Sequence, residues 1–233
     1  PSNNVTLTLD LYHIAIKDRI LLGATYDGTS DPVVAKILAD SGVTSIVGVQ
    51  FPTNALDTKT DGIDVTANYR IPAGAGLFDL FASFNYTKNK ITRIAPLPAI
   101  LRGTPTIYTS ALDLVTINAI ERNRPDRRIN ASVNYSVGRF HALGRASHYG
   151  NFRDGSLDGI ETFGAKTLFD TEVGYNFNQI NVSIGARNLF DTYPDPVLVE
   201  ANTNNGAFPW PGASPFGYNG RYLYVRAEMF LNK

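Results

Sequence analysis

Apolar and polar residues alternate strictly along several stretches of the chain. In residues 63–71 the odd positions are apolar and the even positions are polar, and the same period recurs in 78–87, 129–137, 169–177 and 182–187. Successive side chains of a β-strand point to opposite faces, so each stretch predicts a strand with one apolar and one polar face. In these stretches the apolar face carries no ionisable residue, whereas the polar face carries charges of both signs. Because a charge on the lipid face of a membrane strand costs ~2–4 kcal/mol at mid-depth, the pattern predicts a barrel that is apolar outside and polar inside.

The connections between the predicted strands are alternately short and long. Eight strands are predicted at about residues 3–18, 51–71, 77–93, 126–138, 139–152, 163–177, 180–191 and 220–232. The short turns are 72–76, 138–139 and 178–179, the long connections are 20–50, 94–125 and 192–219, and an intermediate loop covers 154–162. Short periplasmic turns and long extracellular loops are typical of outer-membrane barrels. We therefore expect an all-β fold, a segment of an antiparallel transmembrane β-barrel; a soluble lectin-like sandwich is the alternative.

Two segments inside the long connections predict helices. Residues 31–40 follow helix-end rules, with Asp31 as N-cap, Pro32 in the first turn and Gly42 as the stop. Residues 111–122 form a second, less regular candidate. No apolar stretch approaches the ~20 residues of a membrane helix, so strands would have to span the bilayer.

Composition narrows the class of protein. The 233 residues carry no net formal charge and no basic tract, which argues against a nucleic-acid partner. Cysteine is absent, as suits an envelope protein. The first residues show no signal peptide, so we expect either a processed chain or a chain whose N-terminal part is missing.

Four stretches in chain order resemble the C-terminal part of TonB-dependent outer-membrane receptors, which are 22-stranded, plug-containing transporters of Gram-negative bacteria. They are residues 11–20, 53–64, 185–194 and 214–226, and the Arg-Asn-Leu-Phe-Asp element at 187–191 is the most specific of the motifs. The resemblance implies that residues 1–233 are one part of such a barrel and that the plug domain is not in this chain. It further implies an integral outer-membrane location, energy-coupled nutrient uptake, and contact with the TonB complex through the plug.

Eight strands from the end of a larger barrel would leave two open edges in lipid, which is not viable. We therefore expect a second polypeptide that supplies the plug and the remaining strands. The alternative is a passive outer-membrane pore or a small self-closed barrel, because eight strands can close. Outer-membrane proteins usually end on an aromatic residue, whereas here Leu231 falls on that position and Asn232 and Lys233 follow it. We therefore expect either that the assembly signal tolerates leucine or that these last residues are not a native end.

The sequence does not predict an enzyme, a cofactor or a metal site. His141 and His148 are seven residues apart and point to opposite faces of one strand, and Ser147 likewise faces away from His148. No nucleophile-elbow, P-loop, dinucleotide or zinc-protease motif occurs. Three acids, Asp154, Asp158 and Glu161, could bind a hard cation such as calcium, but a solvated acidic loop is the commoner explanation.

Candidate ligand contacts lie in the last long loop and on the predicted inner face of the barrel. The loop aromatics could stack on a sugar ring or on an aromatic siderophore group, or could instead pack against one another and keep the loop compact. The inner-face arginines could meet an anionic ligand or pair with carboxylates of the barrel or plug. The candidates are Phe208, Trp210, Phe216, Tyr218, Arg128, Arg145 and Arg187, with Arg226 on the same predicted face. For Gly62 we expect a bend in a long strand, and for Asn188 and Asp191 hydrogen bonds to turn backbone.

Overall fold

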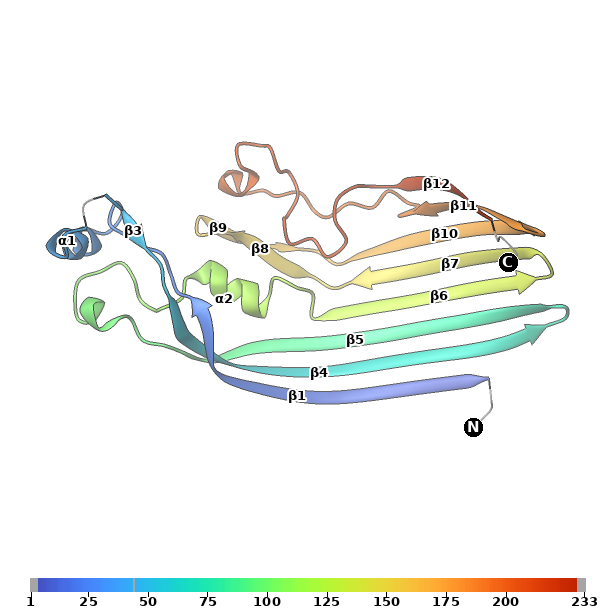
Figure 1. Ribbon diagram of the computed structural model, residues 1–233, viewed down its shortest axis with the longest axis horizontal. Helices are drawn as coiled ribbons and strands as arrows, with labels where there is room; N and C mark the ends of the chain where they lie inside the picture. Colours follow the sequence, from blue (N-terminus) through green and yellow to red (C-terminus); the bar gives the residue numbers. More distant parts are fainter. Residues whose placement is uncertain (1–3, 44, 230–233) are drawn as a thin grey trace. The chain divides into compact units, whose positions relative to one another are not determined.

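A computed structural model describes residues 4–43 and 45–229 and shows one large sheet (Figure 1). Its eight strands have the order β1-β4-β5-β6-β7-β10-β11-β12, so strands that follow one another along the chain lie side by side. The sheet strands are β1 (Val5–Leu22), β4 (Pro52–Ala73), β5 (Gly76–Ile94), β6 (Arg127–Val137), β7 (Phe140–Tyr149), β10 (Lys166–Phe177), β11 (Ile180–Arg187) and β12 (Tyr222–Met229). The shorter elements are β2 (Tyr26–Asp27), β3 (Gly48–Val49), β8 (Phe152–Ser156), β9 (Gly159–Phe163), α1 (Pro32–Asp40), α2 (Leu114–Glu121), and the 3-10 turns Ala99–Leu101 and Glu200–Thr203.

The predicted all-β architecture is confirmed, and strand ends differ from the prediction by a few residues. The short turns contain Gly74, Gly138 and Asn178, whose φ angles of 60°, 56° and 60° are left-handed and favour glycine and asparagine. The predicted continuation of the last strand to 232, and the register of Leu231, Asn232 and Lys233, lie outside the described residues. No helix in residues 4–43 and 45–229 has the length and apolar character of a membrane-spanning helix.

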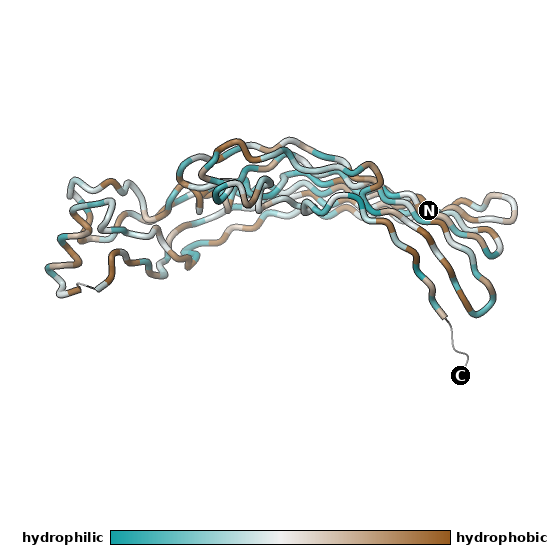
Figure 2. The backbone as a smooth tube through the Cα atoms, turned by 90° about the horizontal axis from the view of Figure 1, so that it is seen from above, coloured by the Kyte–Doolittle hydropathy of each residue, from teal (hydrophilic) through white to brown (hydrophobic). Residues whose placement is uncertain are grey.

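The register of the sheet places the alternating residues on two distinct faces. Tyr135, Ala142, Val173, Ile184 and Val225 lie directly opposite one another in one row across five strands. The row two residues away has the same apolar character, and the rows between them carry the polar residues. Hydrophobic and hydrophilic residues accordingly follow one another along the strands (Figure 2). Val173, Ile184 and Val225 are 42%, 59% and 72% exposed, and a large exposed apolar surface of this kind needs an apolar environment. We call the two sides the apolar face and the polar face.

Contacts divide the chain into two compact units. The first unit comprises the described residues of 1–12, 62–88 and 122–233, and the second comprises those of 13–61 and 89–121. The first unit therefore contains the short-turn end of the sheet, the β8–β9 hairpin and the last long loop. The second contains β2, β3, both helices and the remaining parts of β1, β4 and β5.

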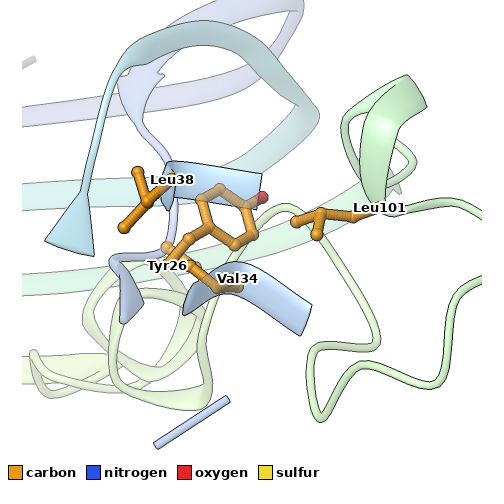
Figure 3. Close-up of a cluster of buried hydrophobic side chains, with 5 residues drawn as sticks. Tyr26, Val34, Leu38 and Leu101 are labelled. Carbon is orange, nitrogen blue, oxygen red and sulfur yellow. The ribbon is translucent and has the colours of Figure 1, made fainter. Parts of the chain in front are cut away.

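The second unit has two small hydrophobic cores of its own. One core gathers Tyr26, Val34, Leu38 and Leu101 with Ala24 (Figure 3). The other is formed by Ala55, Leu56 and Leu112. Ordering a long connection costs conformational entropy, and burial of apolar residues offsets this cost. These cores therefore explain why two long loops are folded.

Helix α1 begins as the sequence predicts, and its N-cap also joins it to a distant loop. The Asp31 carboxylate accepts hydrogen bonds from the Val33 amide (2.8 Å), the Ile107 amide (2.9 Å) and the Thr106 hydroxyl. Its side chain is almost fully buried. The hydrogen bond from Thr106, together with those from backbone amides, lowers the pKa of Asp31 despite the opposing effect of burial. Asp31 is therefore an ionised link between two loops.

Helix α2 starts three residues later than the predicted 111. Asp113 caps it instead: its carboxylate accepts from the Thr116 amide at 2.7 Å, and its carbonyl accepts from the Ile117 amide. Ala111 and Leu112 precede the cap and are buried. The apolar residues that suggested a longer helix are therefore core residues of the loop.

On the polar face, large side chains cross glycines on neighbouring strands. Tyr224 on β12, Gly185 on β11 and Glu172 on β10 lie opposite one another, and the Tyr224 hydroxyl donates to the Glu172 carboxylate at 2.7 Å. His141 likewise crosses Gly174 to reach the Ser183 hydroxyl at 3.3 Å. A Cβ at either glycine would overlap the crossing ring. Glycine thus lets one side chain bond to the second strand along.

Gly62 belongs to the same arrangement. The Tyr12 ring lies over it, and the Tyr12 hydroxyl is 2.6 Å from the Thr87 hydroxyl. From the sequence we expected Gly62 to permit a bend; the structure shows that the side chain of any other residue would occupy the place of the Tyr12 ring.

We predict that Gly62→Ala lowers the free energy of unfolding by ~1–3 kcal/mol, as overpacking does, because the three atoms nearest to the added methyl all belong to the Tyr12 side chain. The urea midpoint of unfolding would measure it. The loss should shrink when Tyr12 is already alanine. Gly144→Ala is the matched control, since its Cβ would meet nothing within 4 Å; equal losses at both glycines would contradict the prediction.

Candidate ligand-contact surface

The sequence-predicted aromatic residues lie in a folded cluster formed by the β8–β9 hairpin and the last long loop, all within the first unit. We call residues 152–163 and 188–221 together the hairpin–loop cluster. The hairpin is held by pairing from Phe152↔Phe163 to Ser156↔Gly159, and these two phenylalanine rings stack at 5.3 Å. Inside the loop, the Val197 amide donates to the Pro209 carbonyl at 2.9 Å. The loop therefore has internal structure and does not extend freely from the sheet.

Asn202 is the main polar link between the two parts of the hairpin–loop cluster. Its carbonyl oxygen accepts from the Ser156 amide at 2.9 Å, and its Nδ2 donates to the Gly159 carbonyl (2.9 Å) and to Glu161 Oε1 (3.0 Å). Glu161 Oε2 accepts from the Leu198 amide at 2.7 Å. Burial acts to raise the pKa of Glu161, but the hydrogen bonds from Asn202 and the loop amides outweigh it and lower that pKa.

The three acids considered for cation binding serve separate contacts. Asp154 accepts from the Ala213 amide (2.8 Å) and from Asn123 Nδ2 (3.2 Å), whereas Asp158 interacts with Ser156 beside the hairpin turn. Glu161 contacts the loop as described above. No group of three or more His, Cys, Asp or Glu side chains suited to a metal occurs within 4–43 and 45–229. Two of the acids, Asp154 and Glu161, thus attach the last loop to the hairpin, a role that neither sequence interpretation anticipated.

The two ends of the last loop are fixed by the Arg-Asn-Leu-Phe-Asp element. Asn188 bonds to both backbone groups of Thr192, and Asp191 accepts from the Arg221 amide at 2.7 Å. Both residues have left-handed φ angles, 49° and 59°. These contacts confirm the backbone role predicted for Asn188 and Asp191.

Asp195 ties the same loop to the start of β10. It accepts from Lys166 Nζ and from the Gly164 amide, both at 2.6 Å. The Lys166 ammonium and the Gly164 amide lower the pKa of Asp195. This attachment is therefore at full strength at neutral pH.

Of the four candidate aromatic residues of the loop, two pack against other rings and two are exposed. Trp210 stacks on Tyr193 with ring centroids 5.3 Å apart, and Phe216 packs on Tyr149 at 5.4 Å. Phe208 and Tyr218 instead are 56% and 45% exposed. Self-packing of the loop, one of the two interpretations of the sequence, therefore holds for Trp210, whereas Phe216 packs on Tyr149 of β7. Phe208 and Tyr218 present aromatic surface to the surroundings.

Trp210 also lines a cavity of about 260 Å³ in the hairpin–loop cluster. Its walls carry carboxylate, hydroxyl and amide groups beside the indole ring. The polar lining residues are Asp154, Ser156, Glu161, Asn202 and Asn204. The chemistry of this cavity suits a polar ligand that offers hydrogen-bond donors and one flat face.

Two of the candidate arginines contact aromatic rings of the polar face. The Arg128 guanidinium lies 4.8 Å from the centroid of Tyr149, the ring on which Phe216 packs. Arg128, Tyr149 and Phe216 therefore form one continuous stack from β6 through β7 to the last loop. Arg187 lies 5.9 Å from the centroid of Tyr224. Cation–π contacts of this kind keep the charge available on the open side of the guanidinium.

The other two arginines face carboxylates. Arg145 Nη1 is 3.7 Å from Asp170, and Arg226 Nη2 is 2.8 Å from Glu172. Glu172 is 8% exposed and also accepts from Tyr224, so it is the acid around which this part of the polar face is organised. Sequence reasoning identified the arginines but missed Tyr149, Glu172 and Asn202, because only the cross-strand register brings them into contact.

We predict that Asn202→Ala loosens the hairpin–loop cluster by ~0.5–1.5 kcal/mol for each hydrogen bond lost, because the half-buried Ser156 amide and Gly159 carbonyl lose this partner. Trp210, the single tryptophan, reports the change, and its emission should shift to longer wavelength. Glu200→Ala, an exposed change in the same 3-10 turn, is the control. Identical emission from both variants would contradict the role of Asn202.

Comparison with known proteins identifies the family to which the sequence belongs. The sequence matches the family model "TonB dependent receptor-like, beta-barrel" over residues 1–189. Comparison with curated protein sequences found no significant match.

Solved structures with a similar fold cover nearly the whole chain. The FrpB iron transporter from Neisseria meningitidis (F3-3 variant) aligns with a TM-score of 0.60 at 13% identity, over 99% of this chain and 30% of that one. The ferric-catecholate import receptor Fiu from K12 E. coli gives 0.57 at 14% identity, over 98% and 26%. The ferric yersiniabactin uptake receptor FyuA from Yersinia pestis gives 0.56 at 14% identity, over 98% and 28%. The chain thus spans less than a third of each of these proteins.

A sheet with one apolar and one polar face, short turns at one end and long folded loops at the other agrees with the family match over most of the sequence. The chain belongs to the TonB-dependent receptor-like β-barrel family, whose members are integral proteins of the Gram-negative outer membrane.

Proposed function

We propose that this chain forms the C-terminal part of the barrel of an outer-membrane receptor for energy-coupled, TonB-dependent nutrient uptake. The observation that carries the proposal is the pair of open sheet edges. β1 and β12 stand at the two ends of the eight-stranded order, and each pairs with one strand among the described residues. Unpaired backbone groups in lipid cost several kcal/mol each, so further strands must cover both edges.

The small self-closed barrel is less well supported. Closure would require β1 to pair with β12, and no such pairing occurs in the described sheet. We propose that a second polypeptide supplies the missing strands and the plug, and that the plug provides the contact with the TonB complex. The partner strands would extend the hydrogen-bonded ladder at both edges.

The proposed ligand contacts are the candidates of the sequence analysis, now in two groups. Phe208 and Tyr218 offer exposed rings, and Trp210 offers the cavity beside it. Arg128, Arg145 and Arg187 offer positive charge on the polar face. The exposed rings and the arginines favour an anionic ligand with a flat group, whereas the cavity, which Asp154 and Glu161 line, would take a hydrogen-bond-donating group of that ligand. Because the names of two structural neighbours refer to ferric chelates, a ferric catecholate is the first ligand that we would test.

We predict that the 25.4-kDa chain, extracted from outer membranes in mild detergent, co-purifies with a second chain that carries a plug and further strands. Denaturing gels and mass spectrometry of the co-migrating material would show it. If residues 1–233 are found within a longer polypeptide, the second polypeptide is excluded and the receptor proposal stands. A lone, folded, heat-modifiable chain would overturn both. Uptake that persists after the proton-motive force is collapsed would indicate a passive pore instead.

We predict that replacing Phe208 and Tyr218 together with alanine weakens binding of a ferric catecholate by ~0.5–1.5 kcal/mol for each ring lost. Titration of the quenching of Trp210 emission in the purified receptor would measure it. Leu198→Ala is the matched control, because Leu198 lies in the same loop and is 84% exposed. An equal effect of Leu198→Ala would show that the two aromatic rings have no specific role.

A further inference from the structure

The apolar face of the sheet is hollowed by a groove in the first unit. Its volume is about 510 Å³, within the ~300–1,000 Å³ of small-molecule sites. Small residues form its floor and larger apolar residues form its sides. The floor consists of Ala131, Gly144 and Ala146, and the sides are Leu80, Val133, Phe169 and Phe190.

The groove arises from the cross-strand register of small residues. Ala131 lies directly opposite Ala146, and Val133 lies opposite Gly144, where a Cβ would meet nothing within 4 Å. Phe190 forms one side by packing edge-on against Phe169, with centroids 5.3 Å apart. The Leu189 amide donates to the Phe169 carbonyl at 2.7 Å and fixes this side. The floor of the groove therefore follows from the register of small residues, and the Phe169 and Phe190 rings bound it on one side.

Basic side chains lie on the same face, toward the long-loop end of the strands. Strand alternation puts Lys88 on the apolar face of β5, Arg127 on that of β6 and His148 on that of β7. His148 follows groove residue Ala146 by two positions, about 7 Å along the strand, and Arg127 precedes Ala131 by four, about 13 Å.

The nearest acidic residue on this face lies on β4: Asp61, which pairs with His13 Nδ1 at 2.6 Å. At the apolar-face positions of β6, β7, β10 and the part of β5 up to residue 88, no acidic residue occurs. His148 Nδ1 is 2.9 Å from the Thr167 hydroxyl on β10. Across the described residues, Lys88 and Arg127 form neither an ion pair nor a side-chain hydrogen bond. Two unpaired cations above an apolar groove complement a ligand with an anionic head and a hydrocarbon tail.

We propose that this groove binds one acyl chain of a phosphorylated lipid of the outer leaflet, with the phosphate held by Lys88, Arg127 and His148. The long-loop end of such barrels is extracellular, so the cations lie at the level of the outer-leaflet headgroups. The apolar face of an outer-membrane barrel contacts lipid, which makes an acyl chain the occupant with direct access. The site is separate from the polar face and does not depend on which nutrient is transported.

The test uses the receptor assembly that contains this chain, extracted from outer membranes, stripped of lipid in detergent and studied by native mass spectrometry. The probes are lipid A and its dephosphorylated form. We expect preferential binding of lipid A, and a loss of about fivefold for each charge removed in Lys88→Ala and Arg127→Ala. Arg127→Gln, which retains more of the side chain, should show the same loss. Arg139→Ala, in the short turn between β6 and β7, should have no effect.

The groove itself is tested by a matched pair of substitutions on β7. Gly144→Leu fills the floor and should reduce binding of both probes, whereas Ala142→Leu lies on the same face outside the groove residues and should not. Heat-modifiability on a denaturing gel confirms that each variant is folded. The proposal is overturned if the two probes bind equally, if Gly144→Leu behaves like Ala142→Leu, or if a protein is found to cover this face.

Discussion

Hydrogen bonding between neighbouring strands is the interaction on which the rest of this structure depends. In hydrocarbon no water replaces a missing partner, so each backbone group of a spanning strand must pair with the next strand. The meander order from β1 to β12 pairs each strand with its neighbours in the sheet, and among the described residues it leaves the outer sides of the two end strands without a partner strand. The same requirement explains the short turns, because a long connection at that end would carry backbone groups that need partners of their own.

Once the strands are paired, the two faces of the sheet are stabilised in different ways. The apolar face remains exposed and relies on its environment. On the polar face, side chains form hydrogen bonds with one another, and some of these bonds span three strands. Tyr224 over Gly185 and His141 over Gly174 show the device: a glycine leaves room, and the crossing side chain bonds to the strand beyond. Glu172, held by Tyr224 and Arg226, is almost fully buried although it lies on this polar face.

The long loops are folded because each has buried residues or internal hydrogen bonds that hold it together. In the second unit two small apolar cores and the buried Asp31 carboxylate order the chain, and in the hairpin–loop cluster Asn202, Asp154 and Asp195 do so with hydrogen bonds. A folded loop positions its side chains before a ligand arrives, which lowers the entropic cost of binding. The stack of Arg128, Tyr149 and Phe216 connects such a loop to the sheet, so a ligand contact at Phe216 would bear directly on the polar face.

The sequence by itself determined the strands, their two faces, the short turns and the start of α1. These features follow from local rules, because the two-residue period, the left-handed turn residues and the N-cap each involve residues that are close together in the sequence. Tertiary structure alone decided the rest. The predicted start of α2 was three residues too early because Ala111 and Leu112, which precede the Asp113 cap, are buried apolar residues of the loop. The acids Asp154 and Glu161 bind backbone amides of the last loop, 59 and 37 residues further along the chain. Glycine 62 is required by the ring of Tyr12 on another strand. Each of these features depends on contacts between residues that are far apart in the sequence. The alternation of apolar and polar residues determines the face of the sheet on which a side chain lies, but it does not determine which residue on another strand the side chain contacts.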